Sequence, residues 1–199
     1  EREEISTKGM QLSDAVKKIL GKPNTKVKIL VKRDRTPDPI EFEITRDRVK
    51  VETVLGHKRK DNDDWDFMID PVTKIGYARL TSFSRNTARD LISVMKQLVS
   101  QNVKGFVLDL RFNPGGLLDS AVDISDLFIG DGLIVSIRPR QGKEQRHSGV
   151  QEGSLLDFPM VCLVNGGSAS GSEIVSACLQ DHHRALIIGE RSYGKGSVQ

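Results

Sequence analysis

The stretch Asn165-Gly-Gly-Ser-Ala-Ser-Gly-Ser-Glu-Ile174 separates two segments of different hydrophobic pattern. Before it, the apolar run Met160–Val164 predicts a buried strand, and after it Ser172–Gln180 has apolar residues at helical spacing. A second buried strand, Ala185–Ile188, leads into the glycine-rich segment Gly189-Glu-Arg-Ser-Tyr-Gly-Lys-Gly-Ser-Val-Gln199. Because parallel strands linked by a helix end at the same edge of a sheet, the pattern predicts an α/β fold in which these two loops meet.

Ser170 on the first loop and Lys195 on the second are residue types that can work together. A serine hydroxyl is a weak nucleophile until a base takes its proton. A lysine amine can be that base once loss of water disfavours its charge, and Ser–Lys pairs are a known variant of the Ser–His–Asp triad. Lys195 lies between Gly194 and Gly196, so we expect backbone to approach it closely and exclude water. The N–H groups that begin the following helix could receive an oxyanion.

The two motifs, with the lysine 25 residues after the serine, resemble the signature of the carboxy-terminal processing (tail-specific) serine proteases. The resemblance implies that Ser170 is the nucleophile, that Lys195 is the base and that Gln199 orients the lysine. Gly171 stands where the family commonly has alanine, a change that keeps the backbone N–H in place. The resemblance further implies a layered ClpP- and crotonase-like core of β-β-α units, and a reaction that needs no metal or organic cofactor.

A third phrase, Asp109-Leu-Arg-Phe-Asn-Pro-Gly-Gly116, matches the same family. By this match, the oxyanion is bound by the N–H of Gly171 together with that of Gly115 or Gly116, and we favour Gly116. Loss of one such donor typically raises a reaction barrier by about 2.7–4 kcal/mol. Taken alone, the phrase would be a strand-to-helix turn whose glycines adopt positive φ.

The serine phrase also allows structural interpretations. Ser170-Gly-Ser-Glu173 has the capping-box pattern, in which the serine and the glutamate cap a helix reciprocally. Capping and catalysis are compatible, because the start of a helix favours negative charge. Ser168 and Ser172 are rival nucleophiles, although Ser172 should already lie in the first helical turn.

The glycine-rich segment and two histidines suggest other chemistries. Gly189–Lys195 matches most of the phosphate-loop pattern, but Gly196 stands where a metal-binding hydroxyl is needed. A nucleotide-binding role is therefore a remote alternative. His182 and His183 lack further ligands at metal-site spacing, so we expect a polar turn and assign no metal.

Composition limits the class of protein. The 199 residues carry a net charge of +3 and no apolar stretch near the 18 residues of a membrane span, so we expect no stable membrane insertion. Residues 1–60 hold 16 Lys and Arg against 10 Asp and Glu, but Phe42 is the only aromatic residue among them, and we expect no nucleic-acid partner. Cys162 and Cys178 have apolar neighbours and are predicted to be buried free thiols.

The N-terminal quarter has a pattern of its own. Leu12–Leu20 predicts an amphipathic helix, and Lys26–Lys32 and Ile40–Thr45 predict a hairpin. This order resembles the last part of a PDZ domain, as found in the same proteases. We therefore expect a partial α+β PDZ module over residues 1–50 and a connecting segment over residues 51–74.

Residues 75–199 are expected to be the protease core, truncated at its C-terminus. N-terminal to the motif at residues 165–174, the hydrophobic pattern predicts further strands at Trp65–Ile69, Ile75–Leu80, Gly105–Leu110 and Leu133–Ile137. It also predicts helices at Ser84–Ser100 and Leu117–Phe128, with a polar loop or hairpin over residues 138–156.

The combined expectation is a serine endopeptidase that cleaves protein substrates near their C-termini. The resemblance implies substrates with unstructured C-terminal tails and a periplasmic or exported location. The alternative is a truncated fragment that binds tails without cleaving them. Because a lysine base must be neutral to act, activity should rise with pH.

Overall fold

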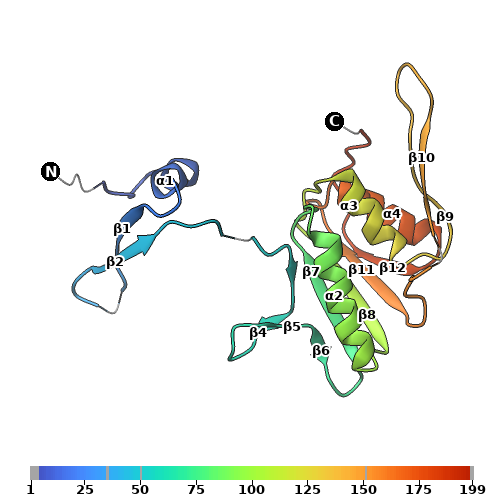
Figure 1. Ribbon diagram of the computed structural model, residues 1–199, viewed down its shortest axis with the longest axis horizontal. Coiled ribbons are helices and arrows are strands. Elements are labelled where there is room, and N and C mark those ends of the chain that lie inside the picture. Colours follow the sequence, from blue (N-terminus) through green and yellow to red (C-terminus); the bar gives the residue numbers. More distant parts are fainter. Residues whose placement is uncertain (1–4, 35, 50, 151, 198–199) are drawn as a thin grey trace. The chain divides into compact units, whose positions relative to one another are not determined.

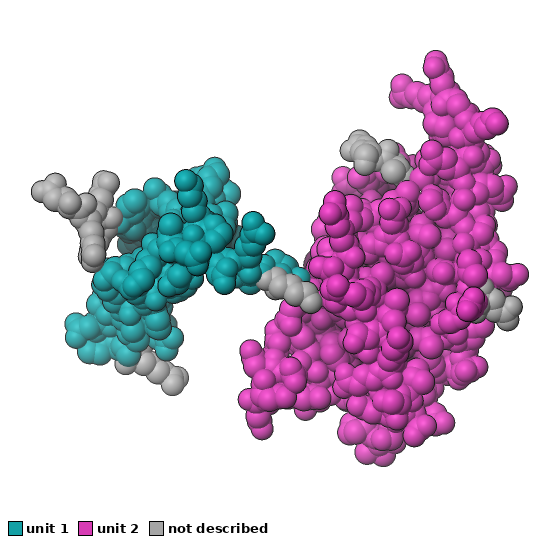
Figure 2. All heavy atoms as spheres, viewed as in Figure 1, with its two compact units in different colours: residues 1–51 teal, residues 52–199 magenta. Residues whose placement is uncertain are grey.

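The computed structural model describes residues 5–34, 36–49, 51–150 and 152–197. The chain divides into two compact units, residues 1–51 and residues 52–199, which Figure 2 colours separately. Among the helices in the described ranges, none combines the length and the apolar character needed to cross a membrane.

The first unit is a helix with a hairpin. It contains α1 (Leu12–Ile19) and the antiparallel pair β1 (Lys26–Val31) and β2 (Ile40–Thr45), close to the predicted bounds. Arg46 ties the two together, because its Nε donates to the carbonyl of Ile19 at 2.6 Å and its Nη1 to the carbonyl of Lys26 at 3.0 Å. No residue of α1 is buried, as expected when one helix and two strands supply little apolar area.

The second unit is built on a six-stranded mixed sheet. Its order is β12 (Ala185–Gly189), β11 (Met160–Val164), β8 (Gly105–Asp109), β7 (Ile75–Leu80) and β3 (Val54–Leu55), and β6 (Met68–Asp70) also pairs with β7. The four strands from β12 to β7 run parallel, whereas β3 and β6 run antiparallel to β7. The predicted α/β fold is therefore confirmed, and the loops that follow β8, β11 and β12 share one edge of the sheet.

Two smaller pairs complete the strands. The hairpin of β9 (Gly132–Ile137) and β10 (Gln145–Gly149) accounts for the segment predicted as a polar loop or hairpin. The single strand predicted at Trp65–Ile69 is instead split between β5 (Trp65–Asp66) and β6. The split arises because β5 pairs with β4 (Lys58–Arg59), whereas β6 pairs with β7.

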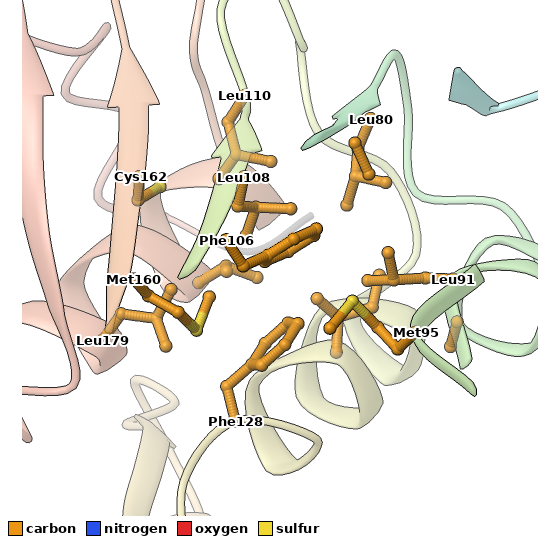
Figure 3. Close-up of a cluster of buried hydrophobic side chains, with 14 of the residues drawn as sticks. Leu80, Leu91, Met95, Phe106, Leu108, Leu110, Phe128, Met160, Cys162 and Leu179 are labelled. Atoms are coloured by element: carbon orange, nitrogen blue, oxygen red, sulfur yellow. The ribbon is translucent and has the colours of Figure 1, made fainter. Parts of the chain in front are cut away.

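Three helices cover one face of the sheet. They are α2 (Thr87–Ser100), α3 (Leu118–Asp126) and α4 (Gly171–Asp181), and Figure 1 shows α2 lying along β7 and β8. Every second residue of β7 and β11 is buried, as expected for strands with one face in the core. Figure 3 shows the resulting cluster, in which the rings of Phe106 and Phe128 stack with centroids 5.8 Å apart.

The two cysteines belong to this core. Cys162 on β11 and Cys178 on α4 are both buried and free, which confirms the prediction. Burial raises the pKa of Cys162 to about 12, so this thiol stays protonated at neutral pH.

Candidate active site

The loops that follow β8 and β11 are in direct contact. The N–H of Ala169 donates to the carbonyl of Asn113 at 3.0 Å. A Cβ added to Gly115 would lie 2.7 Å from the Cβ of Ser170, so only glycine fits there. The motif at residues 109–116, expected to supply an oxyanion donor, therefore contacts the motif at residues 165–174, expected to supply the nucleophile.

The three serines of the turn differ in what their hydroxyls do. Ser168 donates its hydroxyl to the carbonyl of Leu110 at 2.8 Å, and Ser172 donates its own to the carbonyl of Asn113 at 2.9 Å. Both side chains are fully buried. Ser170 is half-buried, and within the described residues its hydroxyl donates no hydrogen bond to a backbone carbonyl. Ser170 is thus the serine of the three that is free to react.

The backbone of Ser170 is strained. Its φ of 53° and ψ of −110° lie outside the regions that residues with a side chain normally occupy. Such a conformation costs roughly 1–3 kcal/mol and persists only where its surroundings enforce it, most often at functional sites. A serine on a sharp strand-to-helix turn is also the arrangement of the nucleophile elbow in α/β-hydrolases.

Glu173 joins the serine turn to the lysine segment. The capping box expected between Ser170 and Glu173 is present, and Glu173 Oε2 accepts the Ser170 N–H at 2.8 Å. The same carboxylate accepts the Ser192 hydroxyl at 2.9 Å, the Gly194 N–H at 2.5 Å and the Lys195 N–H at 3.1 Å. Because one oxygen accepts from both Ser170 and Lys195, their backbone nitrogens lie within about 6 Å of each other.

The expected enclosure of Lys195 by backbone is wrong. Within the described residues, no atom beyond the chain neighbours lies within 4 Å of a Cβ built on Gly194 or Gly196, and Lys195 is exposed. Both glycines have positive φ, +84° and +57°, so they serve the path of the loop rather than a close approach. Gln199, expected to orient the lysine, lies outside the described residues.

The contacts of the lysine segment also bear on the phosphate-loop alternative. A phosphate cradle uses backbone N–H groups of the loop to hold the anion. Here the N–H groups of Gly194 and Lys195 already donate to Glu173. A carboxylate therefore occupies the place of the anion, which disfavours nucleotide binding.

The two glycines considered as oxyanion donors are not equivalent. The N–H of Gly115 donates to Asn113 Oδ1 at 2.9 Å. Within the described part of the chain, the hydrogen bonds that form these turns include none donated by the N–H of Gly116 or of Gly171. The geometry therefore favours Gly116 over Gly115 as the partner of Gly171.

Phe83 supports both of these glycines. Its carbonyl accepts the N–H of Leu117 at 2.8 Å, and its N–H donates to the carbonyl of Gly115 at 2.9 Å, which holds the turn on either side of Gly116. A Cβ on Gly171 would lie 3.0 Å from the Phe83 ring, closer than side chains normally pack. The ring thus fills the space that an alanine methyl group at position 171 would need.

Sequence reasoning missed some residues of the site, or understood them only in part. These are Phe83, Asn113, Asn165 and Glu173. Asn113 also donates from Nδ2 to the carbonyl of Leu80 at 2.9 Å, and Asn165 Oδ1 accepts the N–H of Gly167 at 3.0 Å. Asparagine followed by proline, as at Asn113, or by glycine, as at Asn165, is a usual turn signal, so both asparagines could have been identified as turn formers. Phe83 carries no such signal, because its contacts exist only once the glycine turn lies against the end of β7.

The histidine pair takes no part in the site. His182 Nε2 lies 2.9 Å from the carbonyl of Leu133, which ties the end of α4 to β9. Among the described residues, no three His, Cys, Asp or Glu side chains are grouped so that they could hold a metal ion.

Glu173 should make the stability of this site dependent on pH. Burial alone would raise the pKa of its carboxyl, but the N–H donors of Gly194, Ser170 and Lys195 and the Ser192 hydroxyl outweigh burial and lower it. A lowered pKa stabilises the folded state above the unfolded value of 4.5, and this contribution disappears as the pH falls through the folded value.

Glu173→Gln should therefore lower the free energy of unfolding by about 1–3 kcal/mol at pH 7, because the amide is a weaker acceptor than the carboxylate. At pH 3, below the unfolded value of 4.5, the contribution of the wild-type carboxylate is already being lost, and the difference should shrink. Urea unfolding at both pH values measures it, with the exposed Glu190→Gln as the control. An equal loss at both pH values would show that the charge of Glu173 does not contribute.

Comparison with known proteins gives consistent matches. Residues 74–199 match the model of peptidase family S41. The chain is 41% identical over 196 residues to a carboxy-terminal-processing protease of Bartonella bacilliformis, covering 96% of this chain and 42% of that protein. It is 38% identical over 195 residues to carboxy-terminal processing protease CtpA of Bacillus subtilis, covering 98% of this chain and 39% of that protein.

Among solved structures, the photosystem II D1 C-terminal processing protease superposes with a TM-score of 0.58 and 30% sequence identity. The match covers 94% of this chain and 49% of that one. The chain thus spans less than half the length of these relatives.

Proposed function

The chain belongs to peptidase family S41, and we propose that it acts as a serine endopeptidase through a Ser170–Lys195 dyad. The observation that carries the proposal is the state of the three serines. Ser168 and Ser172 are buried and hydrogen-bonded, whereas Ser170 is strained, half-buried and at the start of a helix. These are the properties that a nucleophile on a tight turn requires.

In the proposed reaction, Ser170 Oγ attacks the scissile carbonyl while the neutral amine of Lys195 takes the hydroxyl proton. The carbonyl oxygen becomes an oxyanion, which the N–H groups of Gly116 and Gly171 receive. Lys195 then gives its proton to the departing amine, leaving an acyl-enzyme. Water activated by the same amine hydrolyses the ester and restores the serine. Gln199 would hold the lysine amine by a hydrogen bond.

Glu173 has a defined place in this scheme. It binds the backbone of Ser170 and of Lys195 and therefore keeps the base segment beside the nucleophile. It does not need to touch the substrate. The exposed Lys195 amine must lose water before it can act, and a peptide lying across both loops would exclude that water.

The names of the relatives, which specify processing at the carboxyl terminus, support a proposal for the substrate class. We propose that this chain likewise cleaves protein substrates with unstructured C-terminal tails, since an extended chain can lie between two surface loops. By the same likeness, we propose that residues 1–50 are part of a PDZ domain and that the protein acts in the periplasm or after export.

One observation favours a second candidate, a module that binds tails without cleaving them. Lys195 is exposed to solvent, and a lysine that has not lost its water is a poor base for a serine hydroxyl. The two candidates agree on the binding of a peptide and differ in whether Ser170 reacts.

A serine-reactive fluorophosphonate separates them. If the proposal holds, incubation at pH 8 should add one probe mass to the protein, and peptide mapping should place it on Ser170. The protein should also shorten a peptide with an unstructured tail. Binding of the peptide with neither acylation nor cleavage would favour the binding module.

A further inference from the structure

A hollow of about 440 Å³ lies at the edge of the sheet where β8, β11 and β12 end. Phe112 and the turn Asn165–Gly167 border it on one side, and Gly189 and Glu190 at the end of β12 border it on the other. One side of the hollow is thus formed by the first residues of the two loops that continue to Gly116 and to Ser170.

Phe112 is unusual in two respects. Its side chain is 69% exposed, so it adds little to the core. Its φ is +60°, a left-handed conformation that bulky residues rarely adopt. The conformation is held because the Phe112 N–H donates to Asn165 Oδ1 at 2.9 Å. A Cβ on Gly167 would come within 3.1 Å of ring atom Cδ1, so the ring lies against this glycine.

The hollow is within reach of a substrate that is being cut. Gly167 precedes Ser170 by three residues, and Phe112 precedes Gly115 by three. Three residues span at most about 10 Å even when fully extended. A side chain within three positions of the scissile bond could therefore enter the hollow while the carbonyl rests at Ser170.

The charges at the hollow disfavour an acidic occupant. Arg111 lines it, but its Nε and Nη2 bond the fully buried carboxylate of Asp109 at 2.9 and 2.6 Å, so its charge is already paired. Glu190 at the opposite side is exposed and would repel an acidic side chain. The exposed phenylalanine ring is then the main attractive surface for a ligand.

We propose that Phe112 determines specificity, as the wall of a subsite for a large apolar side chain, such as leucine or an aromatic residue, within three positions of the scissile bond. This inference rests on the proposed peptidase function and names part of its substrate. An exposed ring already held in one conformation contributes contact area with little further loss of entropy.

The test is a peptide series that differs only in leucine or alanine at each of the three positions on either side of the cleaved bond. The wild-type protein should show a higher kcat/KM with leucine at one of these positions. Phe112→Asn removes the ring but suits positive φ, so the fold should be kept and the leucine preference should fall by at least about tenfold. Phe112→Leu should retain most of the preference.

Val72→Asn is the matched control, because Val72 is 88% exposed on the turn between β6 and β7 and does not border the hollow. Its thermal unfolding and leucine preference should equal those of the wild type. Cleavage without any leucine preference, or a preference that survives in Phe112→Asn, would overturn the inference. If the wild-type protein cleaves no peptide and Ser170 is not acylated, the proposed function itself fails, and the inference fails with it.

Discussion

Ser170→Ala should lower the rate of peptide cleavage by at least about 10⁴-fold, because no other hydroxyl in the turn can replace the lost nucleophile. The rivals Ser168 and Ser172 are fully buried and donate to backbone carbonyls. The fold should be kept, since the Ser170 side chain gives no hydrogen bond to a backbone carbonyl within the described residues and loss of its cap on α4 should cost only about 1 kcal/mol. Steady-state cleavage assays and thermal unfolding measure the two effects separately.

Alanine at the rival positions should give the opposite pattern. Ser168 links two elements, since its Oγ donates to the Leu110 carbonyl at 2.8 Å and accepts the Asn165 N–H at 3.0 Å. Ser168→Ala should therefore destabilise the protein by about 1–3 kcal/mol, because it leaves buried backbone groups unpaired. The folded fraction should still react with a fluorophosphonate. Persistent cleavage by Ser170→Ala, with no labelling of folded Ser168→Ala, would move the nucleophile to position 168.

Hydrophobic spacing was sufficient to predict most elements of the second unit, because each has one face in a single core. The ends of the elements were less predictable. The second helix was expected to begin at Ser84 but begins at Thr87. There the Thr87 hydroxyl accepts the Ser84 N–H at 2.9 Å, which favours a turn over helix. Local competition of this kind does not appear in a hydrophobic pattern.

The sequence predicted which loops form the candidate site, but not the hydrogen bonds that hold these loops together. The sequence indicated that the turns at Gly116 and Ser170 would meet, and they do. It did not indicate that Asn113 would join them, because this requires bonds to partners 33 and 59 residues away. Glu173 was predicted only as a helix cap. Its bonds to residues 192–195 depend on where the segment after β12 runs, which no local pattern encodes.

The error at Lys195 has a related cause. Glycines on both sides of a residue can allow close packing or can provide positive φ, and the sequence is the same in either case. Here Gly194 and Gly196 have positive φ and open surroundings. Desolvation of the lysine must then come from the substrate, from Gln199 or from both, if the dyad operates as proposed.

Lys195→Arg should lower the rate of cleavage by at least about 10³-fold, because a guanidinium keeps its proton at any pH the protein survives and cannot serve as a base. The substitution preserves the positive charge, and the Lys195 N–H that donates to Glu173 belongs to the backbone. Peptide affinity and thermal stability should therefore change little, which separates loss of the base from loss of structure. Lys143→Arg, in the exposed loop between β9 and β10, is the control and should remain active.

The pH dependence provides a second and independent test of the same residue. If a neutral lysine takes the proton of Ser170, kcat/KM of the wild-type protein should rise between pH 6 and pH 9, because the fraction of unprotonated amine rises over that range. The residual rate of Lys195→Arg should lack this rise, since arginine does not titrate there. A wild-type rate that falls between pH 7 and pH 10, or an arginine variant with the same rising profile, would contradict Lys195 as the base. The loops would then still meet as the structure shows, but the proton of Ser170 would have to leave through another group.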